Sequence, residues 1–369
     1  MDASRDHLRT DAGHGRRPAR HVLTIVTGLV ALIAACTPGT SPTVPPNATG
    51  SILPPATGSP PPLPSASASA AAFPLTLVDD DGTSVTIKAQ PQHVVSLTPA
   101  ATETLFAIGA GDRVVAKVED PANYPPEASS LPVVGTFDSV DIEKIVGLGA
   151  DLVIAGGNGG TPPASIDRLR SLGLPVVVVY ADDVDRVFSD IELIGDAVGS
   201  GAAARDLAAS MRAGFDQVAA ATASVGKPRV FYETGDMPAI YGVADKSFVS
   251  SMIELAGADP VTTGSTTNWE MPTEALVKAD PEIIVLGDAA YGVTPDKVTA
   301  RPGWSVLTAV KRKAIEPIDD IIVTRPGPRL LDGLRALVAA IHPDLNLPAE
   351  ASASAPVASA PVASASPAG

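Results

Sequence analysis

A helix followed by a turn and a strand occurs twice in this chain, and this repetition limits the possible folds more than any other feature. Residues 141–156 align without a gap to residues 272–287, with Glu143 opposite Glu274 and apolar residues at matching positions. Short apolar strands alternate with helices on either side of both copies, which is typical of a parallel sheet covered on both faces. The sequence therefore predicts an α/β protein made of two related lobes.

Residues 200–224 lie between the two copies and predict one long helix. The segment has no proline and is rich in alanine, and Ser200 can cap its first turn. One face of this helix carries an apolar stripe, formed by Leu207, Met211, Phe215 and Val218. A helix of this length spans roughly 35 Å. Its periodicity fits two arrangements equally well: a strut that joins the two lobes, or an ordinary helix packed on one sheet.

Residues 1–36 predict an export signal. Arg16, Arg17 and Arg20 precede an apolar run, residues 22–35, that is shorter than a typical membrane-spanning helix. The run is followed directly by Cys36, the only cysteine in the chain. This arrangement resembles the lipobox of bacterial lipoproteins, in which the signal is cleaved before the cysteine and the thiol is acylated. A plain signal peptide or an uncleaved anchor is the alternative.

Two segments of biased composition flank the predicted folded part, residues 73–347. Residues 37–72 are rich in Pro, Ser, Thr, Ala and Gly and carry no charge, and residues 348–369 are similar in character. Such segments cannot bury enough apolar surface to offset the entropy lost on ordering. We interpret the first as a flexible tether and the second as a disordered tail.

Composition argues against several classes of protein. The net charge of −15 provides no basic face for a nucleic acid. His93 and His342 are the only histidines of the predicted folded part, so neither a site for a bare metal ion nor a cofactor is expected. The glycines after Ala155 imitate a dinucleotide fingerprint, but Pro162 stands where its third glycine is required. We therefore expect a binding protein rather than an enzyme.

Several motifs in residues 91–345 resemble those of bacterial ABC-importer substrate-binding proteins for corrinoids, ferric siderophores and haem. The matching motifs are VVSLTPAATETLFAIG from Val94, YPP from Tyr124, VGTF from Val134, DIEKIV from Asp141, RPGW from Arg301 and RPGPR from Arg325. The resemblance implies a class III periplasmic binding fold, in which two Rossmann-like lobes are joined by one long rigid helix. Its parts would be an N-lobe at residues 91–181, the linking helix at 200–224 and a C-lobe at 228–345.

The resemblance also implies a partner and a way of docking on it. Family members that bind vitamin B12 dock on their permease through one glutamate in each lobe, and these positions correspond to Glu143 and Glu274. Both glutamates could simply complement the dipole of the helix that they begin. In the functional interpretation, the two carboxylates form an acidic surface with one group on each lobe, and this surface pairs with arginines of an ABC permease dimer. The permease works with its ATPase. The protein would then be lipid-anchored through Cys36 to the outer face of the bacterial cytoplasmic membrane.

The resemblance places the ligand in the cleft between the lobes. Phe137, Trp269 and Arg325 match positions that contact the ligand in the family. Haem receptors often use a tyrosine or histidine ligand, which Tyr124, Tyr232, Tyr241 and Tyr291 leave open, and Tyr241 is taken as the candidate among them. Aromatic rings can cover the flat face of a macrocycle, and a guanidinium can pair with carboxylate, phosphate or amide oxygens. The alternative is that the rings are core residues and that Arg325 forms a structural pair at the surface.

The identity of the ligand stays open. Vitamin B12-binding members carry a tryptophan where this chain has Gly156, an aspartate near Ile321 and a tyrosine near Pro121. The expected ligand is a metal chelate, either a corrinoid such as cobalamin or a ferric siderophore. A haem-binding receptor, or a sensor or adhesion lipoprotein of the same fold, is the alternative.

Overall fold

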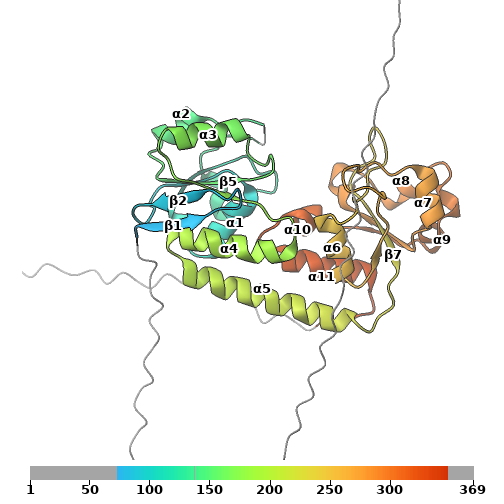
Figure 1. The fold of residues 1–369 in the computed structure, drawn as a ribbon. Helices are drawn as coiled ribbons and strands as arrows, with labels where there is room; N and C mark the ends of the chain where they lie inside the picture. Colours follow the sequence, from blue (N-terminus) through green and yellow to red (C-terminus); the bar gives the residue numbers. More distant parts are fainter. Residues whose placement is uncertain (1–72, 137, 348–369) are drawn as a thin grey trace, which may run out of the picture. The chain divides into compact units, whose positions relative to one another are not determined.

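The computed structural model describes residues 73–136 and 138–347. Outside the described residues lie the predicted signal peptide with Cys36, the tether, the tail and Phe137. The described part contains two four-stranded parallel sheets and a two-stranded antiparallel hairpin (Figure 1). The hairpin pairs β1 (Leu75–Val78) with β2 (Ser84–Ile87).

The first parallel sheet forms the N-lobe and has the strand order β4-β3-β5-β6. Its strands are β3 (Val94–Ser96), β4 (Val114–Lys117), β5 (Leu152–Gly156) and β6 (Val176–Val179). Every residue of β3, β5 and β6 is buried, as expected for a parallel sheet that helices cover on both faces. The helical segments of this lobe are α1 (Pro99–Ala107), η1 (Gly111–Arg113), η2 (Pro126–Ser130), α2 (Ile142–Gly147) and α3 (Pro163–Ser171).

The second parallel sheet forms the C-lobe and has the strand order β10-β9-β7-β8. Its strands are β7 (Arg229–Glu233), β8 (Asp259–Pro260), β9 (Ile283–Leu286) and β10 (Ile315–Pro317). The helical segments of this lobe are α6 (Phe248–Leu255), α7 (Thr273–Ala279), η3 (Gly287–Tyr291), α8 (Pro295–Thr299), η4 (Trp304–Val306), α9 (Thr308–Arg312), α10 (Asp320–Thr324) and α11 (Leu330–Ile341).

The two sheets share one topology, which confirms the repetition seen in the sequence. In each sheet the first strand of the lobe lies between the second and the third, and the fourth strand lies beyond the third. The repeated unit is α2 with β5 in the N-lobe and α7 with β9 in the C-lobe, and β5 and β9 are each the third strand of their sheet. Glu143 and Glu274 therefore belong to equivalent helices.

Two packed helices, α4 (Val184–Val198) and α5 (Gly201–Thr222), connect β6 of the N-lobe to β7 of the C-lobe. The predicted long helix is α5, whereas α4 was missed. The rings of Phe188 and Phe215 meet edge to face across the two helices, with centroids 5.5 Å apart. The turn between the helices depends on Gly199, whose φ of 75° is in the left-handed region that favours glycine.

The buried face of α5 contains most of the predicted apolar stripe. Met211, Phe215 and Val218 are buried, and Leu207 is half-buried against the same core. The prediction that the Ser200 side chain caps the first turn of α5 is wrong. Ser200 occupies the N-cap position, but its Oγ accepts a hydrogen bond from Arg113 Nη2 at 3.1 Å instead of one from the first helical turn.

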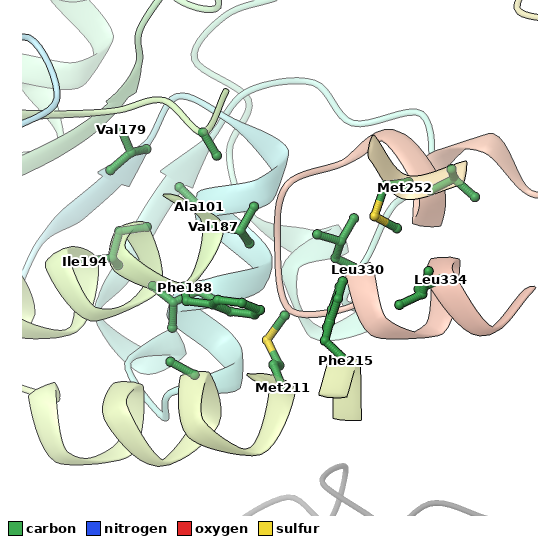
Figure 2. Close-up of a cluster of buried hydrophobic side chains, with 14 of the residues drawn as sticks. Ala101, Val179, Val187, Phe188, Ile194, Met211, Phe215, Met252, Leu330 and Leu334 are labelled. Carbon is green, nitrogen blue, oxygen red and sulfur yellow. The ribbon is translucent and has the colours of Figure 1, made fainter. Parts of the chain in front are cut away.

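One apolar cluster surrounds α5 and contains side chains from both lobes. Figure 2 shows Met211 beside Phe188 of α4, and Phe215 beside Leu330 of α11. Gly214 of α5 lies so close to Leu331 that an added Cβ would overlap that side chain. The long helix thus packs against α4 and against α11 of the C-lobe, rather than on a single sheet.

Candidate functional site

A cavity of about 420 Å³ lies at the carboxyl ends of the N-lobe strands. Its walls come from the segments after β3, β5 and β6, from α1 and α4, and from the C-lobe segment around Arg325. The apolar part of the lining includes Pro99, Val179, Ile191, Ile194, Ile321 and Pro326. Strand β3 lies between β4 and β5, so the connection after β3 leads to one side of β3 and the connection after β4 returns to the other side. Open α/β sheets bind ligands at the point where the strand order reverses in this way.

The segment after β5 needs glycine to form its part of the wall. A Cβ atom added to Gly156 would lie 2.7 Å from Thr98 Cγ2, and one added to Gly157 would lie 2.9 Å from Tyr180 Cβ. Neither distance is possible without displacing a neighbour. Thr98 also accepts a hydrogen bond from the backbone N–H of Ala101 at 3.0 Å and so caps α1. This packing holds the ends of β3, β5 and β6 close together around the cavity.

Two arginines of the C-lobe bind two buried carboxylates of the N-lobe, and we call these four residues the interlobe clasp. Arg325 donates from Nη1 and Nη2 to the two oxygens of Asp120, at 3.1 and 2.8 Å, and from Nη1 to Glu103 at 2.6 Å. Arg329 donates from Nε and Nη2 to the two oxygens of Glu103, at 3.0 and 2.6 Å. The side chains of Asp120 and Glu103 are 3% and 1% exposed. Two positive and two negative charges therefore compensate each other in the clasp.

The clasp also changes the acidity of its members. Burial alone would raise the pKa of Asp120, but the hydrogen bonds and charge of Arg325 outweigh burial, and the pKa of Asp120 is lowered. The hydrogen bond to Glu103 is the largest influence on Arg329 and raises the pKa of that guanidinium. Arg329 also stacks on Tyr124, with Cζ 3.9 Å from the ring centroid.

Arg325, a predicted ligand-binding residue, lies in the wall of the cavity. Its guanidinium already has two protein partners in the clasp, and its side chain is 13% exposed. The structural pairing considered as the alternative is therefore present, but its carboxylates are buried rather than at the surface. A ligand oxygen would have to share or displace Asp120 and Glu103, and the ligand role of Arg325 stays a prediction.

The two predicted aromatic residues of the C-lobe lie on neighbouring segments. Tyr241 follows β7 and forms a β-bridge with Glu270, and the N–H of Gly242 donates to the carbonyl of Trp269 at 2.9 Å. Trp269 is 41% exposed, so it is not the core residue considered as the alternative, and Tyr241 is half-buried. In the described structure neither residue lines the N-lobe cavity. Their contact with a ligand, like that of Phe137, stays a prediction.

Other exposed apolar side chains occur at the same end of the C-lobe sheet. Met237 follows β7 and Tyr291 follows β9, and they are 80% and 87% exposed. Trp269 follows β8, so each of three successive strand ends is followed by an exposed large apolar side chain. The sequence did not indicate Met237 as a candidate for a binding surface, whereas Tyr291 is one of the tyrosines left open as a haem ligand.

A buried acidic group lies at the carboxyl ends of β7 and β9. Glu233 accepts from both Nη atoms of Arg301, at 2.7 and 2.6 Å, and Arg301 also pairs with Asp236 and stacks on Trp304. Asp288 is 2% exposed, and neither of its carboxylate oxygens has a hydrogen-bond partner within the described part of the chain. Burial first, and then the negative charge of nearby Glu233, raise the pKa of Asp288 to about 7.

Glu143 and Glu274, the predicted docking residues, are both exposed in the first turns of α2 and α7. The cap of α2 is supplied by Asp141, which accepts from the N–H of Lys144 at 2.9 Å. Glu143 is therefore not needed to cap its helix. Docking through these two carboxylates stays a prediction.

In residues 73–136 and 138–347, no group of three or more His, Cys, Asp or Glu residues is arranged to hold a metal ion. Over the same residues, no helix combines the length and the apolar character that crossing a membrane requires.

One acidic residue at the cavity, Asp190 of α4, was missed in the sequence. It is 7% exposed and lines the cavity, and its Oδ1 finds no hydrogen-bond partner among the described residues. Burial first, and then the charge and hydrogen bond of Asp80, raise the pKa of Asp190 to about 8. The available signal was an acidic residue on the apolar face of a helix, since Val187, Ile191 and Ile194 recur around it with helical spacing.

Comparison with known proteins shows what this arrangement is similar to. A family model described as periplasmic binding protein matches residues 94–320, which include both parallel sheets and α5. An uncharacterised ABC transporter substrate-binding lipoprotein from Bacillus subtilis is 35% identical over 277 residues, covering 74% of this chain and 87% of the relative. A cobalamin-binding protein from Halobacterium salinarum is 30% identical over 287 residues, covering 74% of this chain and 75% of that protein.

A solved structure agrees with these sequence matches. The periplasmic vitamin B12 binding protein BtuF of Vibrio cholerae superposes with a TM-score of 0.59 at 26% identity, covering 68% of this chain and 96% of that protein. Together the matches confirm the predicted fold class and the prediction of a binding protein rather than an enzyme.

Proposed function

This chain belongs to the periplasmic binding protein family, and from that premise we propose that it captures a metal chelate outside the cytoplasm and delivers it to an ABC permease. One observation carries the proposal: Glu143 and Glu274 are exposed on equivalent helices of two lobes with the same topology. Such a pair of carboxylates suits a dimeric permease that presents one arginine site for each lobe. The relatives named as ABC transporter substrate-binding and cobalamin-binding proteins support the same function.

The ligand that we propose is a corrinoid, with a ferric siderophore as the other chelate considered. The relatives named for cobalamin and vitamin B12 support a corrinoid. So do the exposed rings of Trp269 and Tyr291, because a flat macrocycle offers an apolar face to aromatic side chains. The cavity of about 420 Å³ has the size of a site for a drug-like molecule. A corrinoid would therefore place one part of itself in the cavity and lie mainly against the exposed loops.

We also propose that Cys36 carries the lipid that holds the protein on the outer face of the cytoplasmic membrane. The lipobox-like sequence and the Bacillus relative named as a lipoprotein support this anchor. The variant Cys36→Ser should leave the membrane fraction. Retention of that variant in the membrane fraction at the level of the parent protein would contradict lipidation at Cys36.

Ligand titration tests the binding half of the proposal. The chain has two tryptophans, and Trp304 is buried under Arg301 while Trp269 is exposed, so quenching by a bound corrinoid should come from Trp269. We expect saturable quenching by cobalamin that is strongly reduced in Trp269→Phe, with cobinamide, haem and ferric siderophores as comparison ligands. A set of titrations in which none of these chelates binds would refute the proposed ligand class.

Charge reversal tests the delivery half. Glu143→Lys combined with Glu274→Lys should abolish uptake and leave cobalamin affinity unchanged, because both side chains are exposed on helices that do not line the cavity. The matched control is Asp206→Lys with Asp216→Lys, which makes the same charge change on the exposed face of α5. Uptake by the glutamate double variant at the level of the control would show that these carboxylates do not dock on the permease.

A further inference from the structure

The cavity of the N-lobe contains one buried acceptor that the described chain does not use. Asp190 of α4 belongs to the lining and is only 7% exposed, and its buried Oδ1 has no hydrogen-bond partner among the described residues. A buried polar atom without a hydrogen bond costs about 1–3 kcal/mol, so an isolated one calls for an explanation. The walls around it are mostly apolar, which makes the missing bond more costly than it would be in water.

The other polar side chains of the lining already have partners. Thr104 donates to the carbonyl of Ala100 at 2.9 Å, and Asn158 donates to Tyr180 Oη at 2.8 Å. Thr98 caps α1, Thr324 donates to the carbonyl of Asp320, and Arg325 is held by the clasp. Within the described lining, Asp190 Oδ1 is thus the buried side-chain oxygen that has no hydrogen-bond partner.

The charges around Asp190 favour a positive guest. Asp80, from the turn between β1 and β2, accepts from Arg186 Nη2 at 2.9 Å and from the N–H of Tyr180 at 2.6 Å. Asp182 adds a further negative charge, and the positive charge of Arg186 acts in the opposite direction without outweighing burial and the charge of Asp80. On the other side of the cavity, the charge of Arg325 is compensated within the clasp. An ionised Asp190 would therefore add to a local excess of negative charge, which a bound cation would offset.

We propose that this cavity binds an ammonium group carried on an apolar body, with Asp190 Oδ1 as the acceptor of its hydrogen bond. The apolar body would contact Val179, Ile191 and Ile194, and the charge-assisted bond would satisfy the orphaned oxygen. The inference rests on the proposed function in taking the cavity as part of the ligand site, and it adds that the captured molecule carries an amine. A volume of about 420 Å³ suits a small amine or one amine-bearing arm of a larger molecule.

The bound cation should displace a proton. The raised pKa of Asp190, about 8, means that the carboxyl group is mostly protonated at pH 7 in the empty protein. An ammonium ion binds to the carboxylate, so close to one proton should leave for each amine bound at pH 7. Below pH 8, affinity should rise about tenfold for each unit of pH, since the protonated carboxyl group must ionise before the ion pair forms. If Asp190 serves only to hold the β1–β2 turn through Asp80, amine binding should not be coupled to proton release.

Isothermal titration of the full chain with phenethylamine tests the proposal. Runs at pH 7 in two buffers of different ionisation enthalpy count the protons released, and phenethyl alcohol is the neutral control of similar shape. We expect saturable amine binding with release of nearly one proton, and binding of the alcohol at least tenfold weaker with no release. Absence of amine binding at millimolar concentration, or amine binding without proton release, would overturn the proposal.

A matched variant separates the carboxylate from the shape of the cavity. Asp190→Asn keeps the size of the side chain and can still donate to Asp80, but it cannot ionise. We expect it to lose at least tenfold in phenethylamine affinity and all proton release, while equal affinity in the variant would refute the role of Asp190. Should the variant not fold, the proton count of the parent protein with amine and alcohol decides the question alone. Cobalamin titration is a separate measurement, so failure of the amine site and failure of the proposed chelate function are distinguishable.

Discussion

Replacing Arg325 by alanine separates two roles that one guanidinium can have. As a member of the clasp, Arg325 compensates Asp120 and shares Glu103 with Arg329. In Arg325→Ala, Glu103 keeps Arg329, but Asp120 loses its charged partner and keeps the backbone N–H groups of Ala122 and Tyr124. Because Asp120 is 3% exposed, the variant leaves a buried charge without its counter-ion.

The expected loss of stability follows from that burial. Removing one partner of a buried ion pair costs about 3–5 kcal/mol. For a protein of this size, 1 kcal/mol shifts the melting temperature by about 2–4 °C, so the loss corresponds to roughly 6–20 °C. Arg205→Ala is the control, since Arg205 and Asp196 form a surface pair with side chains 55% and 46% exposed. Its removal should cost less than about 1 kcal/mol.

The loss should also depend on pH in a defined direction. The pKa of Asp120 is lowered in the folded protein, so its stabilising contribution is present above the unfolded value of about 3.9 and is lost as pH falls through the folded value. Urea unfolding of the parent protein and Arg325→Ala at pH 7 and at pH 3 measures this change. The difference in unfolding free energy should be smaller at pH 3. Equal stability of the two proteins at pH 7 would refute the clasp and favour an arginine held free for ligand.

Two further predictions concern the ends of the strands. Gly156→Ala should destabilise the protein by about 1–3 kcal/mol, because its Cβ would lie 2.7 Å from Thr98 Cγ2. Adding Thr98→Ser removes that methyl group and keeps the hydroxyl that caps α1. The double variant should therefore recover most of the lost free energy of unfolding, measured by urea unfolding. The pKa of Asp288 is raised to about 7 in the folded protein. Its contribution to the stability of the fold is therefore fully present below the pKa of the unfolded state and is lost as pH rises through the pKa of the folded state. Asp288→Asn should therefore gain stability relative to the parent as pH rises from 4 to 8, and a difference that does not change with pH would contradict this.

The architecture could be predicted because local signals agreed with each other. The repeated segments both became a helix leading into the third strand of a sheet, and fully apolar stretches such as Val176–Val179 became buried strands. The predicted stripe of α5 became buried because both neighbouring elements present apolar side chains to it. Helix α4 was missed although its signals are in the sequence: Asp183 caps it, Gly199 ends it, and Val187, Ile191 and Ile194 recur with helical spacing.

The site could be predicted only in part, because its contacts join residues far apart in the chain. The motif around Arg325 indicated an arginine with a function, but nothing local to it shows that Glu103 and Asp120 lie within hydrogen-bonding distance. Asp190 and Asp80 belong to different elements, and their proximity depends on how the β1–β2 turn meets α4. Trp269 was identified from its match to a family position and Tyr241 as a possible haem ligand, and the β-bridge that brings their segments together appears only in the fold.

The two lobes are held by interactions of different kinds, and this difference bears on how a ligand could enter. Around α5 the lobes share an apolar cluster that includes Phe215 and Leu334, and separating it would expose close-packed side chains to water. In the clasp the lobes are joined by charged groups, for which water is a much better substitute than it is for a hydrophobic core. Movement between the lobes would therefore break the clasp before it disturbs the core around α5. Arg325, which belongs to both the clasp and the cavity wall, is then the residue through which an incoming ligand could alter the contact between the lobes.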